Sequence, residues 1–221
     1  MGSRIVQSSE IVTLIGAGPV ADDVLHESLT IAPKVIAADG GAKTAMSRGR
    51  VPEAVIGDFD SLDSRLRAAI PPDRLHHIAD QNTTDFEKAL SAIAAPLILA
   101  VGFTGQRLDH ELAVYNALVR GLGPPVIVLG EEDLCFALTG EVTLALEVGT
   151  RISLFPMAEV RCANTGLRWP TDHLTFRPWG RVGTSNEAAL PEVTLRPSGT
   201  GMLVIMPRDT LTQVIAALVD G

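Results

Sequence analysis

Cysteine and aromatic residues are scarce in this chain of 221 residues, and positive charge is outnumbered by negative charge. The cysteines, Cys135 and Cys162, lack the Cys-x-x-Cys spacing of a zinc or redox site, which favours two free thiols in a reducing compartment. Aromatic residues make up 4% of the chain, so its cores should be aliphatic. The 18 Lys and Arg against 26 Asp and Glu give a net charge of −8, which argues against bulk electrostatic binding of nucleic acid or an anionic membrane.

Long hydrophobic runs are also missing, because no stretch reaches the roughly 18 apolar residues of a membrane span. The apolar run at residues 11–18 lacks the basic flank and cleavage site of a signal peptide, and we interpret it as a first strand and turn. We therefore expect a cytoplasmic protein. The 46% hydrophobic and 20% charged content argues against disorder, and the length suits one or two domains.

The first 130 residues alternate between short aliphatic runs and stretches with helical spacing. Such alternation predicts crossover units and a parallel sheet covered on both faces, whose strands read as continuous apolar runs. The expected strands are residues 11–15, 35–38, 54–56, 97–101 and 126–129, and the clearest helices are 85–93 and 108–119.

The pattern changes near residue 132. Val142, Leu144, Leu146 and Val148 alternate with other residues, as in strands with one buried face. Frequent Pro and Gly punctuate the rest, which favours small antiparallel sheets or a sandwich, followed by a short last helix. We predict an α/β chain with a domain at residues 1–132 and a second domain at 133–221.

A G-x-G-x-x-A pattern occupies residues 16–21, after the first expected strand. Asp39 follows about twenty residues later, where the ribose-binding acid of a dinucleotide enzyme would lie. A nicotinamide or flavin enzyme is thus one alternative, and glycines that serve only a tight turn are another. Gly40 and Gly41, directly after Asp39, suggest a backbone that comes close to a ligand.

Two acids, Asp58 and Asp60, follow the expected strand at residues 54–56. Ligands bind at the carboxyl ends of parallel strands, and carboxylates two apart point the same way if the chain is extended. Two such carboxylates repel each other unless a cation lies between them. Oxygen ligands favour Mg²⁺ as that cation. The alternative is that one of them caps a helix that begins near Ser61.

Thr84 and Glu87 form a capping-box pattern, which places Asp85 in the first turn of a helix. There Asp85 is either a functional acid or only a partner of the helix dipole. Lys88, one turn later, can reach the same space and meet a phosphate.

After the strand at residues 97–101, Gly102 and Gly105 permit a close turn before Arg107, Asp109 and His110. The planar fork of an arginine suits a phosphoryl oxygen. The alternatives are a surface pair of Arg107 with Asp109 and a histidine with no ligand. Acids and an arginine at three successive strand ends nevertheless match metal-assisted phosphoryl transfer.

The ordered set of motifs resembles the thiamine pyrophosphokinase family over nearly the whole chain. The motifs are ADGGA at 38–42, GDFDSLD at 57–63, TTDFEKAL at 83–90, G-x-T-G-x-R-x-D-H at 102–110 and TSNE at 184–187. The resemblance implies an amino-terminal Rossmann-like parallel-sheet domain and a carboxy-terminal antiparallel β-sandwich. It also implies a homodimer with shared sites, and transfer of the terminal pyrophosphoryl group of ATP to thiamine, with Mg²⁺.

The resemblance also implies residue roles. The catalytic residues would be Asp58, Asp60, Asp85, Arg107 and Asp109, of which Asp58, Asp60 and Asp85 hold the metal. The nucleotide would meet Asp39, Gly40, Gly41, Ser61, Gln81, Thr84, Lys88, Gly102 and His110. Thiamine would meet Thr184, Ser185 and Asn186.

Three further residues bear on the substrate. Trp179 either stacks on the cationic ring of thiamine or lies in the sandwich core. Lys43 and Gln106 depart from common family patterns, which leaves the substrate more open than the reaction. The alternatives are a pyrophosphokinase for another alcohol such as a hydroxymethyl pterin, an NAD-dependent oxidoreductase, and a non-catalytic nucleotide or thiamine sensor.

Overall fold

The computed structural model describes residues 4–105 and 107–219, so Gln106 lies outside the described residues. The described chain divides into two compact units. The first unit contains the residues up to 117 together with 122–131, and the second contains 118–121 and the residues from 132 onward. Within the described chain, no helix has both the length and the apolar character needed to cross a membrane.

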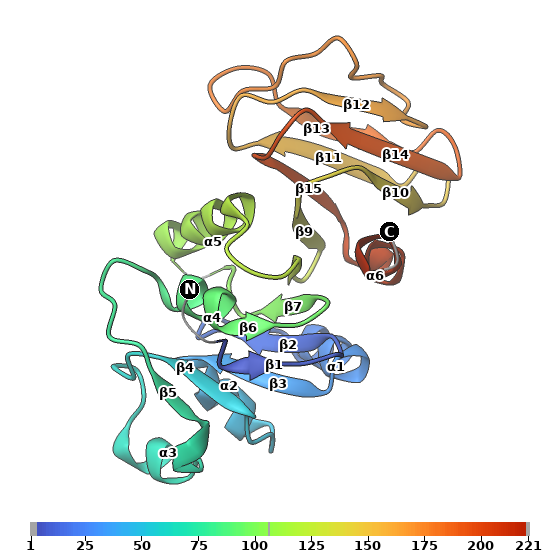
Figure 1. The fold of residues 1–221 in the computed structure, drawn as a ribbon. Coiled ribbons are helices and arrows are strands. Elements are labelled where there is room, and N and C mark those ends of the chain that lie inside the picture. The colour runs from blue at the N-terminus through green and yellow to red at the C-terminus, as the bar shows by residue number, and fades with distance from the viewer. Residues whose placement is uncertain (1–3, 106, 220–221) are drawn as a thin grey trace. The chain divides into compact units, whose positions relative to one another are not determined.

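A parallel sheet forms the centre of the first unit, with strand order β8-β7-β2-β3-β4-β5 (Figure 1). Every residue of β2, β4, β7 and β8 is buried, as the continuous apolar runs predict. The strands are β2 (Val12–Ile15), β3 (Lys34–Ala38), β4 (Ala54–Gly57), β5 (Leu75–His77), β7 (Ile98–Val101) and β8 (Val126–Leu129).

Helices connect these strands, and a short parallel pair of β1 (Val6–Gln7) with β6 (Ile93–Ala94) adds to the unit. The helices are α1 (Asp22–Ile31), α2 (Gly41–Ser47), α3 (Ser64–Ala68), α4 (Asp85–Ala92) and α5 (Leu108–Arg120), with a 3-10 turn at Pro72–Arg74. The predicted capping box of α4 is confirmed: the Glu87 amide donates to Thr84 Oγ1 at 3.3 Å, and the Thr84 amide donates to Glu87 Oε2 at 2.8 Å.

The strands of the second unit pair antiparallel (Figure 1). Four of them, in the order β13-β11-β15-β9, are part of the large mixed sheet, and a separate sheet has the order β10-β14-β12. Val142 and Leu144 of β10 are buried and Thr143 is exposed, so the period-two pattern is confirmed there. The elements are β9 (Asp133–Leu138), β10 (Val142–Ala145), β11 (Arg151–Pro156), β12 (Cys162–Thr165), β13 (Gly183–Glu187), β14 (Glu192–Pro197), β15 (Met202–Pro207), a 3-10 turn at Arg208–Thr210 and α6 (Leu211–Val219).

Helix α6 packs beside β10 and buries Leu211 and Val214. The expected free thiols are confirmed, since Cys135 and Cys162 are both unpaired and buried. The chain thus combines crossover helices with a large mixed sheet and a separate antiparallel sheet, which is a mixed α/β fold.

Candidate active site

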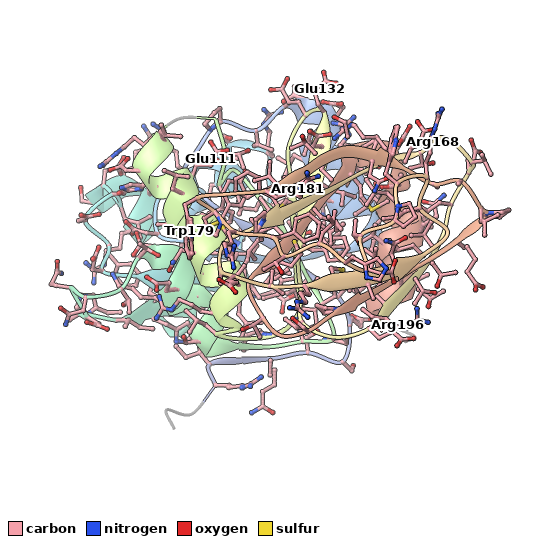
Figure 2. All side chains as sticks on the ribbon, turned by 90° about the horizontal axis from the view of Figure 1, so that it is seen from above. Glu111, Glu132, Arg168, Trp179, Arg181 and Arg196 are labelled. Atoms are coloured by element: carbon pink, nitrogen blue, oxygen red, sulfur yellow. The ribbon has the colours of Figure 1, made fainter. Side chains whose placement is uncertain are left out.

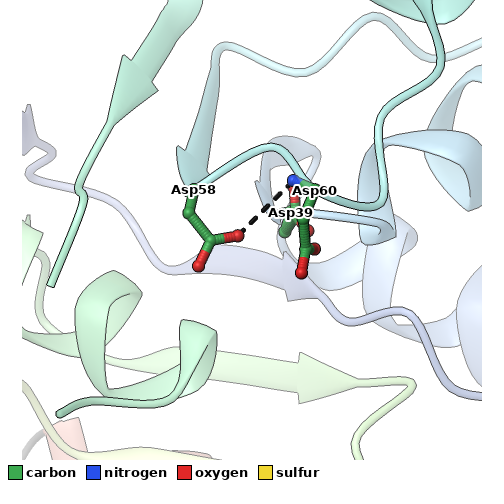
Figure 3. Close-up of side chains that lie close together, drawn as sticks. All are labelled: Asp39, Asp58 and Asp60. Atoms are coloured by element: carbon green, nitrogen blue, oxygen red, sulfur yellow. Dashed lines mark hydrogen bonds between the residues drawn. The ribbon is translucent and has the colours of Figure 1, made fainter. Parts of the chain in front are cut away.

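Three carboxylates meet where β3 and β4 end. These strands are parallel neighbours, so their carboxyl ends lie at the same edge of the sheet. Asp39 follows β3 directly, and Asp58 follows β4. One oxygen each of Asp39, Asp58 and Asp60 lies within 4.8 Å of the others, and Figure 3 shows the three side chains together.

Asp58 and Asp60 reach this cluster by a tight turn. The chain is not extended at residues 58–60, so the condition under which the two acids would point the same way is not met: Phe59 has a left-handed φ of 66°. The turn brings the Asp60 amide to 3.4 Å from Asp58 Oδ1 (Figure 3). The alternative of a helix cap at these two acids is also wrong: α3 begins at Ser64, and Asp63 caps it by accepting from the Leu66 amide at 2.8 Å.

Asp39 is the most buried of the three acids, with 1% of its surface exposed. Its Oδ2 accepts from the Ser61 amide at 3.2 Å, whereas its buried Oδ1 has no hydrogen-bond partner within the described chain. Burial, and next the neighbouring Asp60, raise the pKa of Asp39 to about 6. Because unpaired buried oxygens are rare, this one suits a bound cation.

Lys88 links this cluster to helix α4. Its Nζ donates to Asp58 Oδ2 at 2.8 Å and to Asp85 Oδ1 at 3.0 Å, while its side chain is 3% exposed. Burial lowers the pKa of Lys88, but the hydrogen bonds with Asp58 and then Asp85 outweigh burial and raise it overall. The bond from Lys88 also lowers the pKa of Asp58. Asp85 is thus the partner of a buried ammonium group, which goes beyond a helix-dipole role.

A pocket of about 320 Å³ lies beside these groups in the first unit. Strand β2 lies between β3 and β7. The chain leads from β2 to β3 on one side and from β7 to β8 on the other, so the loops after β2 and β7 diverge at the point where open parallel sheets bind ligands. Of the residues predicted for the site, seven line the pocket: Asp58, Thr84, Asp85, Lys88, Gly102, Arg107 and His110.

The glycines after β2 pack the loops of this pocket against each other. A Cβ atom at Gly16 would lie 2.4 Å from the carbonyl oxygen of Gly102, and one at Gly18 would lie 2.7 Å from it. The Gly18 amide donates to that same oxygen at 2.8 Å. Loop packing therefore accounts for this glycine pattern without a dinucleotide.

Other predicted residues lie next to the pocket or away from it. Gly40 and Gly41 start α2, where a Cβ at Gly41 would lie 1.9 Å from the Ile15 carbonyl oxygen. The Ser61 hydroxyl donates to Asp60 Oδ1 at 3.0 Å. Gln81 is exposed in a turn and does not line the pocket.

Arg107 and Asp109 form an exposed ion pair of 2.6 Å, with 63% and 66% of their side chains exposed. The expected surface pair is therefore present. Arg107 nevertheless lines the pocket, so its guanidinium can meet an anion there.

The second unit has a pocket of its own, of about 310 Å³. Thr184, Ser185 and Asn186 line it together, as residues predicted to bind one substrate should. The Asn186 side chain is buried and holds the backbone of Trp169: its Nδ2 donates to the Trp169 carbonyl at 2.7 Å, and its Oδ1 accepts from the Trp169 amide at 3.2 Å.

Two aromatic residues line this pocket, Trp169 and Phe176, and the sequence singled out neither. Trp179, labelled in Figure 2, does not line this pocket. Its exposed fraction is 75%, so its interpretation as a core residue is wrong. Trp169 is followed by Pro170 and Trp179 is preceded by Pro178, and both lie in the loop between β12 and β13. Nothing in the local sequence ranks one tryptophan above the other.

The family model described as thiamin pyrophosphokinase, catalytic domain, matches residues 25–126. Thiamine pyrophosphokinase 1 of Oryza sativa subsp. japonica is 27% identical over 172 residues, covering 69% of this chain and 64% of that protein. Thiamine pyrophosphokinase 1 of Arabidopsis thaliana is 26% identical over 166 residues, covering 65% and 61%. All three kinds of comparison agree on the thiamine pyrophosphokinase family.

Solved structures of the family share the fold. Thiamin pyrophosphokinase from Candida albicans aligns with a TM-score of 0.74 at 16% identity, over 91% of this chain and 92% of that chain. The Geobacillus thermodenitrificans structure aligns with a TM-score of 0.73 at 24% identity, over 89% and 96%. The resemblance inferred from the motifs is confirmed, while the chain matches less than two thirds of the length of the plant relatives.

Proposed function

We propose that this chain transfers the terminal pyrophosphoryl group of ATP to the hydroxyl of thiamine, which yields thiamine diphosphate and AMP. The observation that carries the proposal is the cluster of Asp39, Asp58 and Asp60 with its unpaired buried oxygen, beside a pocket that also contains Lys88 and Arg107. Carboxylates, a buried ammonium and a guanidinium around one pocket are suited to polyphosphate chemistry. Agreement of the comparisons on the family supports thiamine as the acceptor.

The reaction joins the hydroxyethyl oxygen of thiamine to the β-phosphorus. The bond from that phosphorus to the bridging oxygen of AMP breaks, and the hydroxyl proton is released. The protein's part is to orient the two substrates and to balance charge on the moving group. Arg107 offers a planar fork to a phosphoryl oxygen, and the loop at Gly102 lines the same pocket.

The acid cluster fits a hard divalent cation, because it offers several carboxylate oxygens and one of them is buried without a partner. We propose that Asp58 and Asp60 hold Mg²⁺, with Asp39 or the predicted Asp85 as a further ligand. When bound, Mg²⁺ supplies positive charge that stabilises the phosphate oxygens.

We propose that the first unit is a Rossmann-like domain that binds the nucleotide. We propose that the second unit is a β-sandwich that binds thiamine in its pocket, at Thr184, Ser185 and Asn186. Gln81, His110 and Asp109 remain proposed contacts at the edge of the nucleotide site. The family resemblance further supports a homodimer with shared sites. The free, buried thiols Cys135 and Cys162 suit a reducing compartment, so we propose the cytoplasm.

AMP release from ATP with Mg²⁺ and thiamine tests the function directly. Thiamine-dependent AMP should appear with wild-type protein and disappear with Asp58→Asn. A hydroxymethyl pterin serves as the competing alcohol, and NADH binding tests the oxidoreductase alternative. Thiamine binding without AMP at saturating Mg²⁺ would instead indicate a sensor.

A further inference from the structure

Lys88 is a buried, positively charged side chain beside the acid cluster. It lies one turn into α4, 5% exposed overall, with its Nζ between Asp58 from the end of β4 and Asp85 from the first turn of α4. The side chains of these acids are 20% and 36% exposed, so the lysine is the most enclosed member of the trio. A charge enclosed to this degree is stable only with its partners in place.

Asp58 belongs to two groups at once. Its Oδ2 accepts from Lys88, whereas its Oδ1 accepts from the Asp60 amide and faces the cluster of Asp39 and Asp60. A cation bound in that cluster and the ammonium of Lys88 would therefore interact with the same carboxylate. Two positive charges sharing one carboxylate repel each other, so each weakens the binding of the other.

We propose that Lys88 is a positioning residue that occupies Asp58 while the acid cluster holds no cation, and that a divalent cation competes with it for this carboxylate. Because of this competition, the three acids bind a divalent cation more weakly than they would if Lys88 were absent. It also leaves Lys88, when displaced, on Asp85 and facing the pocket it lines. This proposal rests on the cation site of the proposed function, but not on thiamine as the substrate.

Mn²⁺ binding to the full chain, in the absence of ATP and thiamine, tests the competition. In Lys88→Met the competing charge is gone, so Mn²⁺ should bind about tenfold more tightly, since a charge within about 4–6 Å shifts the proton affinity of a carboxylate by one to three pKa units. Lys88→Arg keeps the charge and should bind like wild type. Lys34→Met is the matched control, because it removes a half-buried ammonium that pairs with Glu53 at 3.5 Å.

A purely structural lysine would give the opposite result, since its loss would disorder Asp58 and weaken Mn²⁺ binding. Unchanged or weaker binding in Lys88→Met overturns the proposal, as does a wild-type protein that binds no Mn²⁺. Neither result depends on thiamine-dependent AMP release, which tests the proposed function separately.

Acylation of Lys88 in the wild-type protein, followed by mass spectrometry, keeps the proposal testable if Lys88→Met does not fold. Lys88 should be labelled slowly in EDTA, where it is enclosed, and at least severalfold faster with saturating Mn²⁺. Lys34 should be labelled equally in both. Equal labelling of Lys88 with and without Mn²⁺ overturns the proposal.

Discussion

At Asp39 a carboxyl group is buried with one oxygen unpaired, in a residue whose φ is 39°. Its pKa of about 6 lies above the ordinary value of 3.8 for an aspartate, so between those pH values the folded state holds a proton that the unfolded state has lost. By linkage, this group therefore contributes stability at low pH that is lost as pH rises from about 4 to about 6. The full loss would be as much as about 3 kcal/mol.

Asp39→Asn should remove the loss of stability that the Asp39 carboxyl causes as the pH rises. Asparagine tolerates a left-handed φ, keeps an acceptor for the Ser61 amide and adds a donor toward Asp60. In EDTA at pH 7.5 the variant should be about 1–3 kcal/mol more stable than wild type by urea unfolding. The difference should grow between pH 4 and pH 6 and then level off. Asp73→Asn controls for the loss of one exposed charge, and a difference that does not vary with pH would refute the assignment.

Arg107 is the second residue for which we predict the effect of a substitution. Arg107→Lys keeps the charge but loses the planar fork, so it should behave almost like Arg107→Ala. If Arg107 stabilises the transferring group, kcat for AMP release should fall on the order of 10³-fold in both variants. Arg65→Lys, on helix α3, is the control. A near-normal kcat for Arg107→Lys would reduce Arg107 to the surface pair with Asp109.

At the scale of elements, the loops after β2 and β7 meet through glycine. Gly16→Ala would place a Cβ 2.4 Å from the Gly102 carbonyl oxygen and 2.8 Å from the Phe103 ring. This contact predicts a loss of about 1–3 kcal/mol in unfolding free energy. Gly140→Ala, with no atom within 4 Å, should stay within about 0.5 kcal/mol of wild type. Equal stability of the two variants would contradict this packing.

The capping residue at the start of α4 contributes to the stability of the fold. Thr84→Ala removes the hydroxyl that accepts from the Glu87 amide, and it should cost about 1 kcal/mol in urea unfolding. Thr84→Ser retains the hydroxyl and should be close to wild type. If Thr84→Ser were as unstable as Thr84→Ala, the lost methyl group rather than the cap would be responsible.

Local signals explain which elements the sequence predicts. The capping box of α4 and the apolar run of β8 need only neighbouring residues, and both were found. Strand β5 was missed because Leu75–His77 is short, polar and at the sheet edge, so it has no apolar run. The φ of 66° at Phe59 gives no sequence signal in a non-glycine residue, so the turn between Asp58 and Asp60 was missed.

At the scale of the whole molecule, the change in hydrophobic period near residue 132 lies beside the division between the two compact units. The division itself reflects long-range pairing, such as that of β9 with β15, which no local pattern encodes. The place of Asp39 in the acid cluster has the same cause, because it depends on β3 and β4 being neighbours. The sequence placed Asp39 at a strand end and assigned it to the nucleotide, with the ribose of a dinucleotide as the alternative.

The proposed dimer with shared sites allows a complementation test. Arg107→Ala damages the nucleotide site of the first unit, and Thr184→Trp fills the pocket of the second. Thr184 is a better position for a large side chain than Ser185, whose φ is 59°. We expect each variant to be inactive alone, and to regain activity when the two are unfolded, mixed equally and refolded together.

The expected recovery follows from random pairing. About half of the twofold dimers would be heterodimers, each with one doubly damaged site and one intact site, so about a quarter of wild-type AMP release should return. Refolding each variant alone provides the control, and mass spectrometry of the intact dimers verifies the pairing. If each site is built within one subunit, no pairing restores an intact site. A mixture that contains heterodimers yet stays as inactive as its parents would therefore exclude shared sites in this protein.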